Sequence, residues 1–303
     1  MRKVLITGAD GFTGKYLAVA LHQAGYEVHG LLLREPLSGN LNGVSAMHVA
    51  DLEDPAALLA VLNTVQPHKV VHLAAIAFVA HGDVDAIYRT NLIGTRNLLQ
   101  ALVQSGLPLD AVLLASSANV YGNAMGGVLD ESTPPAPAND YAVSKLAMEY
   151  VARLYANQLP LVVTRPFNYT GVGQSDSFLI PKIINHVRQR APVIELGNLQ
   201  VARDFSDVRT VVQYYSRLLE SPGAIGQTFN VCSGVAHSLS DVLAMARSLS
   251  GHAMEVRVNP AFVRANEVAT LIGSRAKLDA CVGTVPVIPL EETLRWMLAG
   301  EKV

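Results

Sequence analysis

A tyrosine and a lysine four residues apart, Tyr141 and Lys145, are the pair in this sequence best suited to acid-base chemistry. Positions i and i+4 lie on one face of a helix, so the ammonium of Lys145 can stand beside the phenol of Tyr141. A free phenol has a pKa of about 10, and a neighbouring cation favours its ionised form. The spacing therefore predicts that Tyr141 is a general acid or base whose pKa is lowered by Lys145.

Two serines, Ser116 and Ser117, close the apolar run at 111–117, which has the length of a buried strand. The carboxyl ends of parallel strands meet at the sheet edge where ligands bind, so a hydroxyl at this point can face a substrate. Such a hydroxyl could donate a hydrogen bond to the oxygen that receives the proton of Tyr141. On position alone, both serines are candidates.

A glycine loop, TGADGFTG at 7–14, lies between a strand-like run at 3–7 and a helical stretch at 13–24. Glycines permit a tight turn and a close backbone approach, and the N-terminus of the next helix presents N–H groups and a partial positive charge. This context predicts a cradle for the pyrophosphate of a dinucleotide. The residues of this cradle are Gly8, Asp10, Gly11, Phe12, Thr13 and Gly14.

Short apolar runs alternate with helical segments through the first half of the chain. The strand-like runs lie at 3–7, 27–33, 44–49, 69–75, 111–117 and 159–166. The helical stretches after the glycine loop lie at 55–64, 84–105 and 139–157. This alternation predicts an α/β fold with a Rossmann-type, doubly wound parallel sheet.

The pattern becomes less regular after residue 166, with helix-like runs at 178–190 and 208–220 and a strand candidate at 193–196. We expect residues 1–166 to form the dinucleotide-binding domain, with 208–232 returning to it. Residues 167–207 and 233–303 are expected to form a smaller α/β lobe that binds the substrate.

Composition favours a soluble cytoplasmic protein. The 303 residues are 50% hydrophobic and 16% charged, and the apolar runs have strand length, so no membrane span is expected. The N-terminus has no room for a signal peptide, and Cys232 and Cys281 give no disulfide framework. A net charge of −2 gives no support for nucleic-acid binding, and nine histidines without paired spacing predict no metal site.

Three motifs together, TGADGFTG, SSANVYG at 116–122 and YAVSK at 141–145, resemble the extended short-chain dehydrogenase/reductase superfamily that acts on nucleotide sugars. The resemblance covers the whole chain. It implies that Ser117 is the catalytic serine and that Lys145 also holds the nicotinamide ribose. The further cofactor contacts that it implies are Asp51 and Leu52 near the adenine, Leu73, Ala74 and Ala75 beside the adenosine half, and Pro166.

The second half of the chain is similar to the branch of GDP-mannose dehydratases and GDP-4-keto-6-deoxy-D-mannose reductases. The segments that carry this similarity lie at 165–180, 196–208, 229–234 and 264–278. The branch implies that Asn168 and Arg203 contact the diphosphate, that Arg264 holds phosphate and that Glu267 holds the nucleotide ribose. The other substrate contacts expected are Ser117, Asn119, Tyr141, Lys182 and Asn198.

Two differences between this sequence and that branch help to distinguish a reductase from a dehydratase. The dehydratases carry a glutamate or an acidic pair just after the catalytic hydroxyl, because eliminating water needs a base and an acid. This chain has Ala118 and Asn119 at those positions, and neither can take a proton. Reductase relatives usually have His, Pro and Trp where this chain has Tyr169, Val172 and Thr284.

The predicted activity is NAD(P)H-dependent reduction of the C4 ketone of a nucleotide-linked 4-keto-6-deoxyhexose. GDP-4-keto-6-deoxy-D-mannose giving GDP-D-rhamnose is favoured. The alternatives are a nucleotide-sugar 4-epimerase with retained NAD, a reductase that forms the C4-epimeric 6-deoxytalose, and a catalytically idle dinucleotide sensor.

NADP(H) is the favoured cofactor, with NAD(H) possible. NAD-specific sheets usually carry an acidic residue at the end of the second strand, whereas the residues at 31–33 are apolar here and Arg34 follows them. Arginine can make two charge-assisted bonds to a 2′-phosphate, although Glu35 could bond the ribose instead. By resemblance we also expect a homodimer, and Leu146, Tyr150, Val151 and Leu154 offer an apolar stripe for it.

Overall fold

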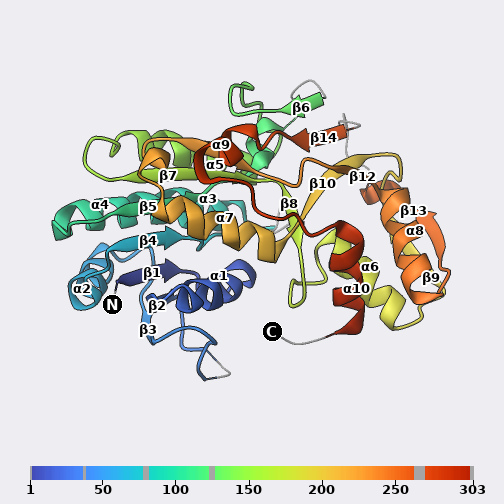
Figure 1. The fold of residues 1–303 in the computed structure, drawn as a ribbon, viewed down its shortest axis with the longest axis horizontal. Helices are drawn as coiled ribbons and strands as arrows, with labels where there is room; N and C mark the ends of the chain where they lie inside the picture. The colour runs from blue at the N-terminus through green and yellow to red at the C-terminus, as the bar shows by residue number, and fades with distance from the viewer. Residues whose placement is uncertain (1, 37–38, 78–81, 123–126, 263–269, 301–303) are drawn as a thin grey trace.

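A seven-stranded parallel sheet is the centre of the protein (Figure 1). The computed structural model describes residues 2–36, 39–77, 82–122, 127–262 and 270–300. The strand order is β11-β7-β5-β4-β1-β2-β3, and every neighbouring pair runs parallel. The predicted doubly wound α/β fold is therefore confirmed. The strands are β1 (Lys3–Thr7), β2 (Glu27–Leu32), β3 (Ala46–Val49), β4 (Lys69–His72), β5 (Ala111–Ala115), β7 (Leu161–Pro166) and β11 (Thr228–Val231).

Several strands end earlier than the apolar runs suggested. Strand β4 stops at His72 and β5 at Ala115, so residues 73–75 and 116–117 lie just beyond the carboxyl edge of the sheet. These residues were predicted to contact ligands, and their position just past the strands places them at the edge where ligands of such sheets bind.

Helices cover both faces of the sheet. Helices α1 (Phe12–Gln23) and α7 (Val208–Glu220) pack against one face, and α2 (Pro55–Val65), α4 (Thr95–Ser105) and α5 (Asp140–Arg153) pack against the other. Side chains alternate between the faces along each strand. In β1, for example, Val4 and Ile6 join the apolar cluster of α1 and α7, while Leu5 joins the cluster of the opposite face.

The long helical stretch at 84–105 is continuous but irregular. It comprises α3 (Val84–Tyr88), a π-helical segment η1 (Arg89–Gly94) and α4. Such π segments often occur at functional sites, because the extra residue per turn redirects a side chain. Here Asn91 bonds both backbone groups of Ile76, accepting from its N–H at 2.9 Å and donating to its carbonyl at 3.1 Å.

A second region, to the right of the large sheet in Figure 1, contains two smaller sheets. One has the order β12-β10-β14-β6, with β8 also paired to β10, and the other pairs β13 with β9. The strands are β6 (Gly127–Leu129), β8 (Asn168–Thr170), β9 (Val193–Leu196), β10 (Ala202–Asp207), β12 (Ala236–Ser238), β13 (Glu255–Val258) and β14 (Thr270–Gly273). The remaining helices are α6 (Leu179–Arg188), α8 (Leu239–Ser250), α9 (Ala276–Val282) and α10 (Leu290–Ala299), with short 3-10 turns η2 (Ala118–Tyr121), η3 (Pro222–Ala224) and η4 (Pro260–Phe262).

An apolar cluster of this second region joins α6, α8 and α10 to β9 and β10. Residues 208–231, which lie between the segments of this region in the sequence, instead supply α7 and the edge strand β11 to the large sheet. Within the described residues, no helix combines the length and apolarity needed to cross a bilayer.

Candidate active site

Ser117, Tyr141 and Lys145 gather beyond the carboxyl end of β5. Ser117 follows that strand and begins η2, accepting a hydrogen bond from the N–H of Asn119 at 3.1 Å. Tyr141 lies in the first turn of α5, and its phenol lies near the hydroxyl of Ser117. Lys145, one turn further, donates to the carbonyl of Ala115 at 2.8 Å. All three candidates are buried.

The electrostatics of Tyr141 differ from the sequence expectation. Burial raises the pKa of Tyr141 to about 12, the neighbouring hydroxyl of Ser117 opposes that rise, and Tyr169 adds to it. The predicted lowering by Lys145 is wrong for this arrangement, because the lysine directs its ammonium to the strand carbonyl and desolvation of the phenolate outweighs other effects. Tyr141 consequently keeps its proton at neutral pH, which is the state that can donate to a substrate oxygen.

Lys145 is close to its own titration point. Burial lowers the pKa of Lys145 to about 8, and the carboxylate of Glu149 opposes that fall. A buried ammonium is therefore present at neutral pH and is lost as the pH rises above about 8.

The structure separates the two serine candidates. Ser117 faces Tyr141, whereas Ser116 donates a 2.6 Å hydrogen bond to Oε1 of the buried Glu149. Ser116 is thus directed away from the phenol, and Ser117 is the serine that could share a substrate oxygen with Tyr141.

The glycine loop has the geometry of an anion cradle. Gly8 has φ of +68°, and a Cβ there would lie 2.9 Å from the backbone of Ala74. A Cβ on Gly14 would lie 2.7 Å from the backbone of Ala9, so neither glycine tolerates a side chain. Helix α1 begins after Gly11 with no side-chain cap and no acidic residue in its first turn. Its N-terminal amides and dipole are therefore suited to a pyrophosphate.

The other residues predicted to contact the cofactor lie around the same edge. Asp10 and Arg34 are exposed, and Phe12 and Thr13 open α1. Pro166 ends β7 at this edge.

The segment predicted to flank the adenosine lies beside the glycine loop. The N–H of Ala74 donates to Oγ1 of Thr7 at 3.2 Å, which ties the residues after β4 to the end of β1. Asp51 is exposed and accepts from the N–H of Glu53, and Leu52 is buried beneath it. Leu73 and Ala75, on either side of Ala74, are half-buried.

The predicted substrate residues are more dispersed. Asn168 of β8 donates to the carbonyl of Asp204 at 3.2 Å, and Arg203 of β10 donates to the carbonyl of Ala202 at 2.9 Å. Lys182 of α6 donates to the carbonyl of Glu195 at 2.9 Å.

Four other predicted substrate residues complete this set. The side chain of Asn198 accepts from the N–H of Gln200 in the turn after β9, and Asn119 is exposed on η2. Arg264 and Glu267 lie outside the described residues.

Tyr169 is a neighbour of the candidate triad that the motifs did not assign to the site. Its hydroxyl bonds Oγ1 of Thr13 at 2.8 Å, its ring stacks on Phe12 at a centroid distance of 6.1 Å, and it raises the pKa of Tyr141. The only signal in the sequence was that a tyrosine stands where reductase relatives have histidine.

A chain of buried hydrogen bonds stabilises α5, the helix that carries Tyr141 and Lys145. Thr95 donates to the carbonyl of Asn91 at 2.7 Å, so it must accept the Nε2–H of His72 at 2.8 Å. Burial lowers the pKa of His72 to about 3, and the imidazole is neutral. Asn91 donates to Ser144, which donates to the carbonyl of Tyr141 at 2.8 Å. The chain thereby connects strand β4 and the π segment to the first turn of α5.

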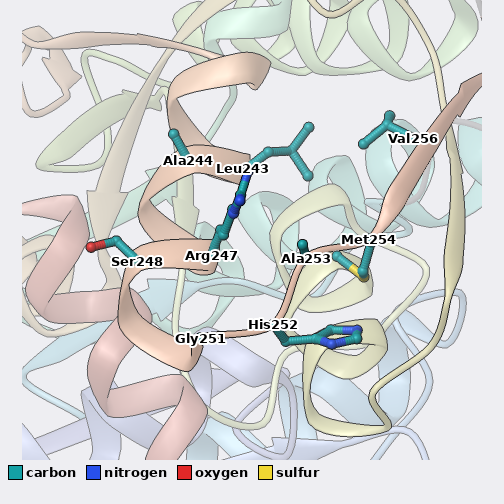
Figure 2. A pocket seen from close by; sticks show the side chains of 9 residues that line it. All are labelled: Leu243, Ala244, Arg247, Ser248, Gly251, His252, Ala253, Met254 and Val256. Atoms are coloured by element: carbon teal, nitrogen blue, oxygen red, sulfur yellow. The ribbon is translucent and has the colours of Figure 1, made fainter.

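A separate hollow of about 530 Å³ lies beside α8 and β13 (Figure 2). Its lining includes Leu243, Arg247, His252 and Met254, and none of its lining residues is among those predicted for the site. The part of the chain that the structure describes contains no cluster of three or more metal-ligating side chains.

Comparisons with known proteins define the class. A protein-family model described as GDP-mannose 4,6 dehydratase matches residues 5–297. The chain belongs to this family, which confirms the predicted membership of the nucleotide-sugar branch of the extended short-chain dehydrogenases/reductases.

Two curated relatives are each 34% identical to this chain. One is a GDP-6-deoxy-D-talose 4-dehydrogenase from Aggregatibacter actinomycetemcomitans, with 93% of this chain and 91% of the relative covered. The other is a GDP-6-deoxy-D-mannose reductase from Pseudomonas aeruginosa, with 98% and 96% covered.

Two solved structures match nearly the whole chain. A "putative epimerase" from Burkholderia cenocepacia J2315 is 52% identical, with a TM-score of 0.93 over 98% of this chain and 97% of that one. RMD from Pseudomonas aeruginosa, complexed with NADPH, is 31% identical, with a TM-score of 0.81 over 99% and 97%.

Proposed function

We propose that this protein is an oxidoreductase that reduces the C4 ketone of GDP-4-keto-6-deoxy-D-mannose with a nicotinamide dinucleotide, forming GDP-D-rhamnose. One observation carries the proposal: a buried, protonated Tyr141 lies beside Ser117 at the same sheet edge as a glycine cradle suited to a pyrophosphate. The two relatives at 34% identity, named for GDP-6-deoxyhexose redox chemistry, support the same reaction class.

The residues of the site account for the proton and the charge of a carbonyl reduction. The bound nicotinamide supplies the hydride. Tyr141 donates its proton to the C4 oxygen as negative charge develops there, and the hydroxyl of Ser117 bonds the same oxygen. Lys145, whose ammonium bonds the carbonyl of Ala115, holds this part of α5 against the end of β5.

Dehydration is disfavoured by the side chains next to Ser117. Removing the proton next to a ketone needs a base, and η2 presents only Ala118 and the exposed Asn119 after the serine. The buried carboxylate of Glu149 is bonded to Arg165 and Ser116, so it cannot substitute. Reduction, which needs only the proton of Tyr141, is the step that these residues support.

NADPH is the cofactor that we propose. Arg34 is exposed after β2, where the carboxyl end of that strand approaches the glycine loop. Its guanidinium can bond a 2′-phosphate in a bidentate manner. RMD, at 31% identity, was solved with NADPH, although some activity with NADH is expected here as well.

A homodimer is proposed on the exposed apolar side chains of α5. Tyr150 and Leu154 are 54% and 76% exposed, whereas Leu146 and Val151 pack into the interior. The dimer surface would therefore use Tyr150 and Leu154, together with Val143 on the same helix, rather than the whole predicted stripe. We also propose a cytoplasmic location, consistent with the free thiols of Cys232 and Cys281.

The test is product identification. The ketone is generated from GDP-mannose by a dehydratase, this protein is added with NADPH, and the sugar is identified by NMR. GDP-D-rhamnose with one NADPH oxidised per product supports the proposal, and the 6-deoxytalose isomer would reassign the stereochemistry at C4. Formation of the ketone from GDP-mannose by this protein alone would overturn the assignment to reduction.

A nucleotide-sugar 4-epimerase is the second candidate, favoured by the 52% identity with the Burkholderia structure. An epimerase uses the same three side chains reversibly and regenerates its cofactor within each turnover. Conversion of a nucleotide sugar to its C4 epimer without net NADPH oxidation would favour this candidate. Binding of the dinucleotide with neither activity would favour a sensor.

A further inference from the structure

Helix α5 carries a third ionisable side chain on the face that holds Tyr141 and Lys145. Glu149 follows Lys145 by four residues, so the three positions lie one turn apart along the helix. The side chain of Glu149 is only 3% exposed. No motif in the sequence assigned a function to it.

The carboxylate of Glu149 is fully engaged in the interior. Oε1 accepts from Ser116 at 2.6 Å and from Nε of Arg165 at 2.9 Å, and Oε2 accepts from the second nitrogen of the guanidinium at 2.7 Å. Arg165, in β7, also donates to the hydroxyl of Tyr121 at 3.1 Å, and Tyr121 donates to Asn230 of β11 at 2.8 Å.

This network joins α5, β7, η2 and β11 next to the candidate triad. Ser116 adjoins Ser117, and Lys145 bonds the carbonyl of Ala115, so α5 holds the end of β5 at two consecutive residues. A buried ion pair is weak evidence for stability, because desolvation offsets the attraction. Its best-attested benefit is to fix one arrangement of the groups around it, which is what an active site requires.

We propose that Glu149, paired with Arg165, is a positioning residue of this active site. Its carboxylate holds the segment that carries Ser117 against α5 and keeps the buried Lys145 in its ammonium form. The kinetic part of this inference rests on the proposed reductase function, whereas the part that concerns Lys145 does not.

Within the part of the chain that the structure describes, the groups that act on Lys145 come from three elements. Glu149 favours the charged form, while burial disfavours it. His72 of β4 interacts with the lysine but is neutral, and Tyr141 on the same helix keeps its proton at neutral pH. Arg165 of β7 bonds the carboxylate of Glu149 through two nitrogens of its guanidinium. Removing the charge of Glu149 must therefore lower the pKa of Lys145.

The direct test observes Lys145 without any substrate. Protein labelled with ¹³C at the ε-carbon of lysine is titrated by NMR, and the Lys145 resonance is assigned as the one absent from Lys145→Arg. In Glu149→Gln the midpoint should move to lower pH by roughly one pH unit. Glu255→Gln is the matched control, because Glu255 also bonds an arginine but lies exposed in β13.

A second variant covers the case in which Glu149→Gln fails to fold around an uncompensated Arg165. Glu149→Met with Arg165→Met replaces the pair by apolar side chains, a change that is often tolerated. The Lys145 midpoint should fall in this variant too, since Glu149 is the charge that raises it. An unchanged midpoint in either folded variant would overturn the proposal.

The kinetic test uses Ser116→Ala, which removes one bond to Glu149 and leaves Ser117, Tyr141 and Lys145 intact. Slight misplacement of Ser117 should lower kcat by about tenfold with KM unchanged. Ser250→Ala, which removes a similar hydroxyl bond in α8, is expected to match the wild type. A wild-type kcat in Ser116→Ala would overturn the positioning of Ser117.

In Glu149→Gln, the alkaline limb of the pH profile should move to lower pH together with the NMR midpoint. If the protein reduces no GDP-4-keto sugar at all, the proposed function fails while the NMR titration still decides the role of Glu149. If the NMR midpoint shifts but the alkaline limb of the pH–rate profile does not, the proposed effect of Glu149 on catalysis is overturned.

Discussion

The two regions that carry predicted site residues hold them in different ways. At the edge of the large sheet, Ser117, Tyr141 and Lys145 are buried. Ser117 lies beside the phenol of Tyr141, and Lys145 bonds the end of the strand. Around the smaller sheets, Asn168 and Arg203 are half-buried or exposed and bond backbone carbonyls of their own sheet.

That difference implies a division of labour. Buried groups packed beside one another are preorganised, so folding has already fixed their geometry before a ligand arrives. Side chains bonded to nearby carbonyls at the surface can exchange those bonds for bonds to a ligand. The first region should therefore govern kcat and the second region KM.

Tyr141→Phe should produce the largest effect, because it removes the donated proton from the preorganised region. We expect kcat to fall about 10²- to 10⁴-fold. Binding of NADPH, measured by fluorescence titration, should be retained. Tyr150→Phe, an exposed phenol on the same helix, is the control. A near-wild-type rate in Tyr141→Phe would exclude Tyr141 from the mechanism.

Arg203→Ala tests the second region. Loss of the proposed charge-assisted bond to a diphosphate should raise KM for the GDP-sugar roughly 10- to 100-fold, with kcat nearly unchanged. Steady-state kinetics measures both values, and Arg257→Ala, which removes an exposed arginine of β13, is the control. A fall in kcat at constant KM would show that the two regions are not divided in this way.

Arg34 lies at the edge of the first region, and Arg34→Ala should alter only the preference between NADPH and NADH. Removing the proposed partner of the 2′-phosphate should lower kcat/KM with NADPH roughly tenfold and leave the value with NADH nearly unchanged. Comparing the two coenzymes in each variant is the measurement. Equal losses with both would assign Arg34 a structural role, and a wild-type preference for NADH would defeat the cofactor proposal.

The smallest effect is expected where the two regions meet. Tyr169→Phe removes the bond between β8 and the first turn of α1, which should weaken dinucleotide binding about threefold. Thr13→Val removes the same bond from the other side. The double variant should bind no more weakly than the single variants, and additive losses would mean that the two hydroxyls act independently.

Local sequence patterns were enough to predict much of the fold. Alternating apolar runs and helical stretches predicted the parallel sheet, and the spacing of Gly8, Gly11 and Gly14 predicted the turn into α1. Short-range periodicity encodes such elements, because it records which side chains must face a common interior. The stretch at 84–105 was also predicted as helical, but its π segment was not, since the bonds of Asn91 to Ile76 depend on tertiary contact.

The protonation states of the site residues could not be predicted from the spacing of residues in the sequence. The i, i+4 relation of Tyr141 and Lys145 indicated a lowered phenol pKa, whereas burial raises it. Desolvation depends on everything packed around a group, and most of those residues are distant in the sequence.

The sequence by itself determined the chemistry that is available: a phenol and an amine one helical turn apart, a serine at a strand end and a glycine loop before a helix. Only the tertiary structure decided how these groups are used. It turned Ser117 rather than Ser116 toward Tyr141, set the pKa of the phenol through burial, and brought Glu149 to Arg165 and Tyr169 to Thr13. The physical reason is that a motif specifies neighbours along the chain, whereas burial and long-range hydrogen bonds arise only when distant segments pack together.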